Sequence, residues 1–283
     1  MSHLIRSGST AALTVLLAGS LAAQDQGPPP YLQIFREQVK FGRAGSHLQT
    51  ESAWPRAFGK AKIKNNYIAL VSTYGPSEVW FVEGHASVAE IEAASKSIAA
   101  TPGLAAELDR LVQADAANVS GGDALLARFV PEASNPGEVN LAQMRVWEVT
   151  IFRVRPGKEG SFFEGAKLFQ SVVQQAKADA PWASYQVQAG MPGPTYLVFS
   201  PHKSLAELDQ NSGTGAAIEK AMTPDLMKQF GTVSEGFVSV QSIVFTVSPE
   251  MSYPMAEWVS QDPAFWNRKA TAPAAPKPAA PKP

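Results

Sequence analysis

The sequence predicts an α+β protein built from two tandem repeats whose sheets close on each other. Three observations lead to this fold class. The chain matches itself at an offset of about 115 residues, each copy carries the same succession of strand and helix patterns, and the composition supports a large core. Hydrophobic residues make up 45% of the 283 residues and charged residues 17%, which is typical of a folded globular chain.

The self-match consists of three stretches that recur in the same order. Residues 39–46 align with 154–161, residues 85–92 with 202–209, and residues 131–134 with 249–252. The offset changes only between the stretches, where surface loops tolerate insertions. We therefore assign residues 31–135 to a first repeat and residues 136–253 to a second.

The second repeat shows its elements most clearly. β-Branched and aromatic residues over 146–154 predict a strand, which Pro156-Gly157 ends. Apolar residues over 162–176 recur at helical spacing and predict the helix that follows. Further strands are predicted over 182–189, 195–199 and 237–247, and a second helix is predicted to begin at Ser204.

Both repeats carry the same signal at the start of their second helix. Ser87 is followed three residues later by Glu90, and Ser204 by Glu207. This spacing is that of a capping box, in which the serine oxygen and the carboxylate accept from free N–H groups of the first turn.

The first helix of the first repeat departs from the pattern of the second repeat. It is predicted over 46–60 and contains Pro55. A proline inside a helix removes a backbone hydrogen bond and clashes with the preceding turn. We therefore expect a kink at this point, or a helix split around Trp54.

Each repeat is thus predicted to have the element order strand, helix, strand, strand, helix, strand, which is the ferredoxin-like topology. A single sheet of this kind exposes an apolar face, and two sheets in one chain can bury these faces against each other. The predicted architecture is two tandem ferredoxin-like (βαββαβ) repeats that form a pseudo-dimeric α/β barrel. Either a monomeric pseudo-dimer or a homodimer is compatible with it.

The two ends of the chain predict its location. Arg6, the apolar run from Ala11 and the small residues up to Ala23 are typical of a secretory signal peptide over residues 1–23. The apolar run of about 13 residues is shorter than the roughly 20 that span a bilayer. We expect an exported, soluble protein, periplasmic or extracellular, without a membrane span. A proline-rich linker over 24–30, a segment over 254–268 that docks on the barrel and a disordered Ala/Pro/Lys tail over 269–283 complete the organisation.

The order of elements, the duplication and the Pro156-Gly157-Lys158 turn resemble the dimeric α/β-barrel superfamily. Its antibiotic-biosynthesis-monooxygenase-like and NIPSNAP-like members look most similar, over residues 31–253. In the first repeat, Phe41 replaces the proline of the turn. The resemblance implies one of several activities, because the superfamily includes cofactor-free oxygenases, haem-degrading and haem peroxidase-like enzymes, and members without known activity.

Composition excludes several classes of function. The net charge of −1 argues against nucleic acid as a partner. The absence of cysteine excludes disulfides, thiolate metal sites and cysteine nucleophiles. No metal site is predicted, because the carboxylates are dispersed and no histidines are paired at ligand spacing. No cofactor is predicted either; haem stays as an alternative, although His47 aligns with Phe162 and the segments near Pro102 and Gly213 lack an axial histidine.

Two histidines are the candidate catalytic residues. His85 and His202 are equivalent in the two repeats and lie two residues before the helix caps. Each can act as a neutral base, because a helix N-terminus disfavours the imidazolium. The alternative is a structural role at the junction of strand and helix.

A set of aromatic and polar residues on or near the predicted strands is the candidate ligand-binding site. Such residues can line a pocket between helices and sheet, and equally can form ordinary core. The set comprises Trp182, Tyr185, Tyr196, Glu148, Tyr67 and Trp80.

The function that the sequence predicts is binding of a small apolar or aromatic molecule in a cleft between helices and sheet. One alternative is a cofactor-independent, monooxygenase-like enzyme. The other is a structural or interaction protein without catalysis, which would act through the Trp258 and Trp266 segment.

Overall fold

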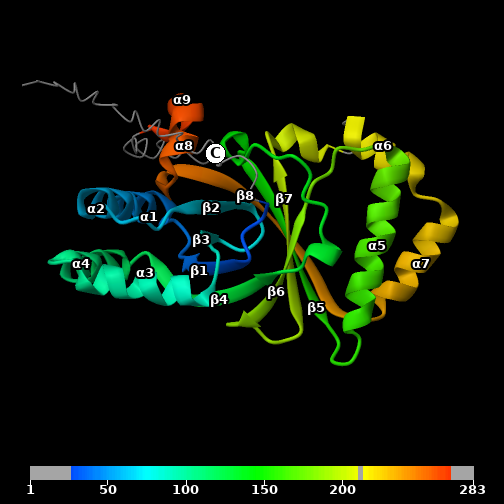
Figure 1. Cartoon of the computed structure of the whole chain (residues 1–283), viewed down its shortest axis with the longest axis horizontal. Coiled ribbons are helices and arrows are strands. Elements are labelled where there is room, and N and C mark those ends of the chain that lie inside the picture. Colours follow the sequence, from blue (N-terminus) through cyan, green and yellow to red (C-terminus); the bar gives the residue numbers. More distant parts are fainter. Residues whose placement is uncertain (1–26, 210–212, 269–283) are drawn as a thin grey trace, which may run out of the picture.

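The computed structural model describes residues 27–209 and 213–268 and contains a closed antiparallel barrel (Figure 1). The barrel has eight strands in the order β1-β3-β2-β8-β5-β7-β6-β4. This confirms the predicted α+β class and the closure of the sheet on itself. The strands are β1 Tyr31–Val39, β2 Tyr67–Tyr74, β3 Glu78–His85, β4 Val119–Phe129, β5 Val146–Val154, β6 Ala183–Ala189, β7 Thr195–His202 and β8 Phe237–Tyr253.

The two halves of the barrel have the same internal strand order. The first half runs β4-β1-β3-β2 and the second runs β8-β5-β7-β6. The registers correspond as well, because Tyr31 of β1 pairs with His85 and Val146 of β5 pairs with His202. Each residue of one half can therefore be compared with its structural counterpart in the other.

Helices cover the outside of the barrel in two groups, α1 to α4 on one side and α5 to α7 on the other (Figure 1). Their apolar faces pack on the sheet in two separate interface clusters. The helices are α1 Ala44–Glu51, α2 Ala53–Ala61, α3 Val88–Ala100, α4 Leu104–Asp115, α5 Glu159–Ala176, α6 Gly213–Ala221, α7 Pro224–Ser234, α8 Ala256–Gln261 and α9 Pro263–Trp266. None of the helices within the described ranges combines the length and apolar character needed to cross a membrane.

The interior of the barrel is a packed apolar core with contributions from both halves. Leu32 and Ile34 of β1 belong to this core, whereas Val39 packs with residues of α2 and α4 on the outer face. Side chains alternate between the two faces of a strand. Odd-numbered residues near the end of β1 therefore point toward the helices, and this places Glu37 at the interface between helices and sheet.

The expected split of the first helix is present. α1 ends at Glu51 and α2 begins at Ala53, so Pro55 lies in the first turn of a new helix. A proline is tolerated there because the N–H groups of a first turn have no partner within the helix.

The two capping boxes differ. At Ser87 the box is complete, since the serine side chain accepts from Glu90 N at 3.1 Å and the Glu90 carboxylate accepts from Ala86 N at 2.7 Å. At Ser204 the prediction of a regular helix is wrong. Glu207 accepts from Lys203 N, but a short 3-10 helix, Leu205–Leu208, takes the place of the α-helix and the serine side chain makes no capping bond.

The C-terminal segment packs against one end of the barrel. Trp266 is buried and donates from Nε1 to Ala142 O at 3.0 Å. The Arg145 guanidinium lies 3.7 Å from the centre of the Phe265 ring and forms an ion pair with Asp262. The predicted signal peptide and the predicted tail over 269–283 lie outside the described residues.

Candidate metal centre

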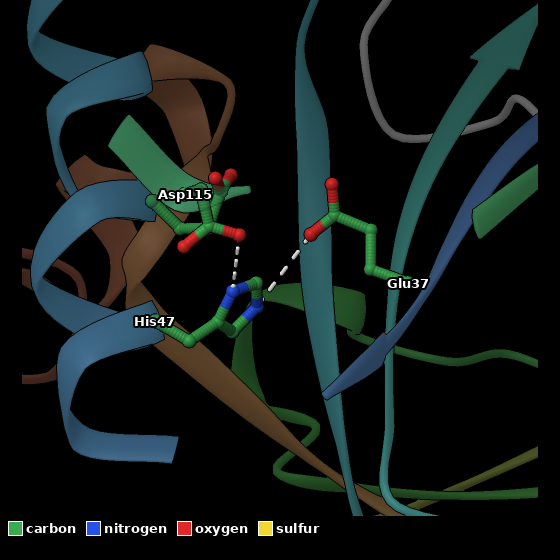
Figure 2. Close-up of side chains that lie close together, drawn as sticks. Glu37, His47 and Asp115 are labelled. Carbon is green, nitrogen blue, oxygen red and sulfur yellow. Dashed lines mark hydrogen bonds and ion pairs between the residues drawn. The ribbon is translucent and has the colours of Figure 1, made fainter. Parts of the chain in front are cut away.

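Four acidic and histidine side chains meet between the sheet and the helices of the first half. Figure 2 shows three of them, Glu37, His47 and Asp115. Glu37 comes from β1, His47 and Glu51 from α1, and Asp115 from the last position of α4. One possible ligand atom from each lies within 4.8 Å of the others. His47 and Glu51 share a helix face because they are four residues apart. Packing of α4 on α1 adds Asp115.

Asp115 fixes the orientation of the His47 ring. The Nδ1 of His47 lies 2.9 Å from Asp115 Oδ2. The other carboxylate oxygen accepts from Asn118 Nδ2 at 2.8 Å and from the Thr50 hydroxyl. Although burial raises the pKa of Asp115, these hydrogen bonds outweigh it and the pKa lies below its usual value. An ionised carboxylate can only accept, so Nδ1 carries the proton of the neutral ring and Nε2 is left as the free nitrogen.

The Nε2 atom of His47 faces a carboxylate oxygen that is also without a partner. The distance from Nε2 to Glu37 Oε2 is 3.6 Å (Figure 2). Both atoms are buried and make no hydrogen bond to any of the residues that the structure describes. The distance exceeds that of a hydrogen bond. Two ligands about 2.0–2.2 Å from one ion at a tetrahedral angle are roughly 3.3–3.6 Å apart, so the gap fits a shared cation.

Glu51 adds a buried carboxylate beside this pair. Burial, followed by the nearby charges of Glu37 and Asp115, raises the pKa of Glu51 to about 9. Burial also raises the pKa of Glu37, against the opposing effect of His47. Within the described ranges, no lysine or arginine forms an ion pair with the three carboxylates. A bound cation would stabilise their ionised forms.

The second half has apolar residues at all four equivalent positions. By strand register and chain offset, Glu37 corresponds to Phe152, His47 to Phe162, Glu51 to Ala166 and Asp115 to Val233. The rings of Phe152 and Phe162 lie 5.5 Å apart, and Phe162 stacks on Tyr196 at 4.0 Å. The barrel therefore does not need polar residues at these four positions, and the polar cluster is a feature of the first half alone.

The predicted ligand-binding residues do not come together in one site. Trp80 and Tyr185 are buried in the barrel core, Tyr67 lies in the interface of the first half, and Tyr196 in that of the second. Glu148 is half-buried on β5. Trp182 is buried and donates from Nε1 to Ala133 O at 2.8 Å, which fixes it to the segment after β4.

The two candidate catalytic histidines end β3 and β7, in separate halves of the barrel. His85 is buried, and its Nε2 lies 3.3 Å from Glu83 Oε2. His202 is partly exposed, and its Nδ1 lies 3.9 Å from the carboxylate of Glu207. Burial lowers the pKa of His202, although Glu148 and Glu207 oppose this effect. Each histidine therefore has its own acidic neighbours, and the two do not form a joint site.

Two hollows near the C-terminal helices are separate from these residues. One of about 470 Å³ is lined by residues that include Arg56, Glu250 and Trp266. One of about 420 Å³ is lined by residues that include Arg145 and Lys203. Neither lining contains a predicted ligand-binding residue.

Sequence reasoning missed the cluster at Glu37, His47, Glu51 and Asp115. The expectation of no metal site rested on the dispersal of the carboxylates, and that argument does not hold in the fold. Folding brings the carboxylates of Glu37, Glu51 and Asp115, which span 78 positions of the sequence, together around His47. A signal was present in the repeat itself, where charged or polar residues of the first copy align with Phe152, Phe162 and Ala166 of the second.

No protein-family model matches the chain, and no curated protein matches it in sequence. Among solved structures, a putative monooxygenase from Fusobacterium nucleatum superposes with a TM-score of 0.48 at 10% identity, over 78% of this chain and 93% of that one. A putative monooxygenase from Lactobacillus acidophilus gives 0.47 at 8%, over 77% and 94%. A haem-binding protein from Thermus thermophilus gives 0.42 at 10%, over 80% and 94%, and chlorite dismutases also match. TM-scores below 0.5 at such low identity do not indicate an activity. The fold is described by the strand order of the barrel itself.

The residues around the described histidines do not fit a haem. A haem needs an axial ligand beside an apolar space for the porphyrin. His47 lies between the carboxylates of Asp115 and Glu37, His85 lies against Glu83, and His202 lies beside Glu207. Neither of the two hollows has a histidine in its lining.

Proposed function

We propose that the protein binds one divalent transition-metal ion through His47 Nε2 and the carboxylates of Glu37 and Glu51. The observation that carries the proposal is the 3.6 Å approach of two buried, unpartnered atoms, His47 Nε2 and Glu37 Oε2. Asp115 is the positioning residue, because both of its oxygens are already occupied by hydrogen bonds. A histidine that donates its other N–H to a carboxylate is the usual arrangement around a metal ion.

The ligand set favours a first-row ion such as Zn²⁺, Fe²⁺ or Mn²⁺. One imidazole and two carboxylates supply nitrogen and oxygen donors, and no thiolate is available because the chain lacks cysteine. Three protein ligands leave one position open, as in catalytic rather than structural zinc sites. An ion held there supplies Lewis acidity to whatever ligand occupies the open position.

The chain's own residues have distinct parts in this arrangement. Asp115 holds the proton on His47 Nδ1 and so keeps Nε2 free to coordinate. Glu51, with its raised pKa, gives up its proton to the solvent when the ion binds. The competing arrangement is a protonated His47 between Asp115 and Glu37, without a metal.

Titration of the chelator-treated protein with Zn²⁺, followed by calorimetry and native mass spectrometry, distinguishes the two. We expect one Zn²⁺ per chain. His47→Phe abolishes binding, but it also takes the imidazole away from buried Asp115. Glu37→Gln, which keeps the side-chain shape at a half-buried position, is therefore the second test variant, and we expect it to lose Zn²⁺ binding while keeping the fold. His202→Gln is the matched control, a histidine outside the cluster, and keeps full binding. An absence of binding, or equal binding by His47→Phe, contradicts the proposal.

Three further expectations are part of this proposal. We infer that the two halves arose by tandem duplication, which their common strand order and register support. We place the chain in the dimeric α/β-barrel superfamily and expect it to be exported after cleavage near Ala23. The same mass spectrum tests export through the mass of the mature chain from an export host, and shows whether that chain is a monomer or a homodimer. Binding of a small apolar or aromatic molecule, the function that the sequence predicts, is compatible with an ion that has one open position.

A further inference from the structure

Among the four residues of the cluster, Glu37 is the one that reaches the solvent. Its side chain is 30% exposed, whereas those of His47 and Asp115 are 2% and 4% exposed. Glu51 is buried as well. An external ligand therefore approaches a bound ion along the Glu37 carboxylate, from the outer face of β1.

The strands beside Glu37 leave one side of this approach open. On the β3 side, Glu37 pairs with Val79, which is buried under the helices. On the β4 side it pairs with Gly122, which is exposed and has no side chain. A Cβ at Gly122 would lie 2.9 Å from Arg36 O, which is too close, and 3.8 Å from Glu37 Cγ, so glycine keeps this side of Glu37 free of a side chain.

The opening continues to the edge of the sheet. β6 pairs with β4 only from Leu126 to Phe129, so Gly122 of β4, beside Glu37, has no paired strand on its far side among the described residues. The chain after β6 lies against the backbone of Ala124 at Gly190, so the opening is confined to the Gly122 part of β4. The next residue of β4 on this face, Ala124, is also small and exposed. The surface beside Glu37 along which a ligand would approach therefore consists of backbone at Gly122 and the methyl group of Ala124. We call this surface the floor of the site.

An aromatic ring lies exposed on the same floor. Phe35 is two residues before Glu37 on β1, so its side chain points to the same face, and it pairs with Ala124. It is 40% exposed, although its β3 neighbour Phe81 is buried in the interface cluster. Phe35 is thus an uncovered apolar surface next to the exposed ligand of the proposed ion.

We propose that the metal ion takes as its external ligand a small aromatic compound with an anionic oxygen, such as an arylcarboxylate or a phenolate. The oxygen occupies the open coordination position beside Glu37, and the ring packs on Phe35 over Ala124 and Gly122. Aromatic pairs contribute stabilisation beyond the area that they bury. This inference rests on the proposed metal site.

Cobalt-loaded protein tests the inference, because the visible absorption of Co²⁺ changes when its ligands change. We expect benzoate to shift the spectrum at lower concentration than acetate, which offers the same carboxylate without a ring. Phe35→Ala raises the dissociation constant for benzoate about two- to tenfold and leaves that for acetate unchanged. Phe41→Ala is the matched control, because Phe41 is a fully exposed phenylalanine in the turn after β1 and not part of the strand that carries Phe35 and Glu37.

The possible outcomes separate the two proposals. If Co²⁺ does not bind, the metal site itself is wrong. If Co²⁺ binds but benzoate is no better than acetate, or if Phe35→Ala and Phe41→Ala behave alike, the metal site stands and the aromatic ligand is overturned. Co²⁺ binding by Phe35→Ala, measured separately, shows that the variant keeps the site.

Discussion

His47 Nε2 and Glu37 Oε2 point at each other across 3.6 Å, and neither atom finds a hydrogen-bond partner within residues 27–209 and 213–268. Buried polar atoms in native proteins are nearly always paired, and exceptions call for an ion or a function. Two of the five such side-chain atoms in the described chain therefore face each other in this one contact.

Replacing Asp115 with asparagine weakens metal binding without removing a proposed ligand. An amide offers one acceptor oxygen, whereas the carboxylate accepts from His47 on one oxygen and from Asn118 and Thr50 on the other. We expect Asp115→Asn to bind Zn²⁺ about 10- to 100-fold more weakly by calorimetry. Asp109→Asn, an exposed change on the same helix, serves as the control. Equal affinity in the two variants would count against a positioning role for Asp115.

Rebuilding the cluster as its apolar counterpart preserves the fold in the absence of metal. The combined change Glu37→Phe, His47→Phe, Glu51→Ala and Asp115→Val copies the second half. Replacing buried charges with packed apolar groups is often neutral or stabilising by about 1–4 kcal/mol. We expect urea unfolding of this variant in EDTA to show equal or higher stability than the wild type.

The single change His47→Ala has the opposite effect in the same experiment. It leaves the buried Asp115 carboxylate without the imidazole, and removing one partner of a buried pair costs about 3–5 kcal/mol. If His47→Ala and the fourfold variant had comparable free energies of unfolding in EDTA, the cluster would not contain buried charges that depend on His47 as a partner.

His202 makes stability depend on pH. Burial lowers the pKa of His202 below 6.5 in the folded chain, although Glu148 and Glu207 act in the opposite direction. The unfolded chain therefore binds the proton more tightly. The free energy of unfolding is therefore fully retained above pH 6.5 and falls as the pH drops below it. We expect His202→Gln to flatten this part of the pH profile of thermal unfolding. Lys203→Gln, which changes a neighbouring group that does not titrate there, leaves the slope in place.

Trp266 anchors the C-terminal helices to the barrel. It is buried, and its Nε1 donates to Ala142 O. Truncation of a buried tryptophan costs about 3–5 kcal/mol, and we expect this loss for Trp266→Ala in urea unfolding. Met255→Ala, at an exposed position of the same segment, changes stability by less than about 0.5 kcal/mol. A loss below that value at Trp266 would show that α9 does not contribute to the folded barrel.

Local patterns in the sequence were enough to predict the strands of the barrel and the helices α1, α2, α3 and α5, but they did not predict α4, α6 or α7. The predicted strand over 146–154 has the observed bounds, because alternation of side chains along a strand is a local property. The split near Trp54 followed from the covalent geometry of Pro55. The helix expected at Ser204 did not form, although the same pattern at Ser87 did, because a capping signal shows where a helix can begin and does not ensure that it continues.

The sequence by itself determined the α+β class, the order of elements in each half and the closure of two equivalent sheets, since these depend on periodic patterns of apolar residues. The tertiary structure decided where chemistry is possible. Glu37, His47 and Asp115 belong to three separate elements, and only the packing of α1 and α4 on β1 brings their atoms within bonding distance of a shared ion. Aromatic residues that looked like a binding site became core instead, because the same large apolar side chains serve both purposes and only their packing partners distinguish them.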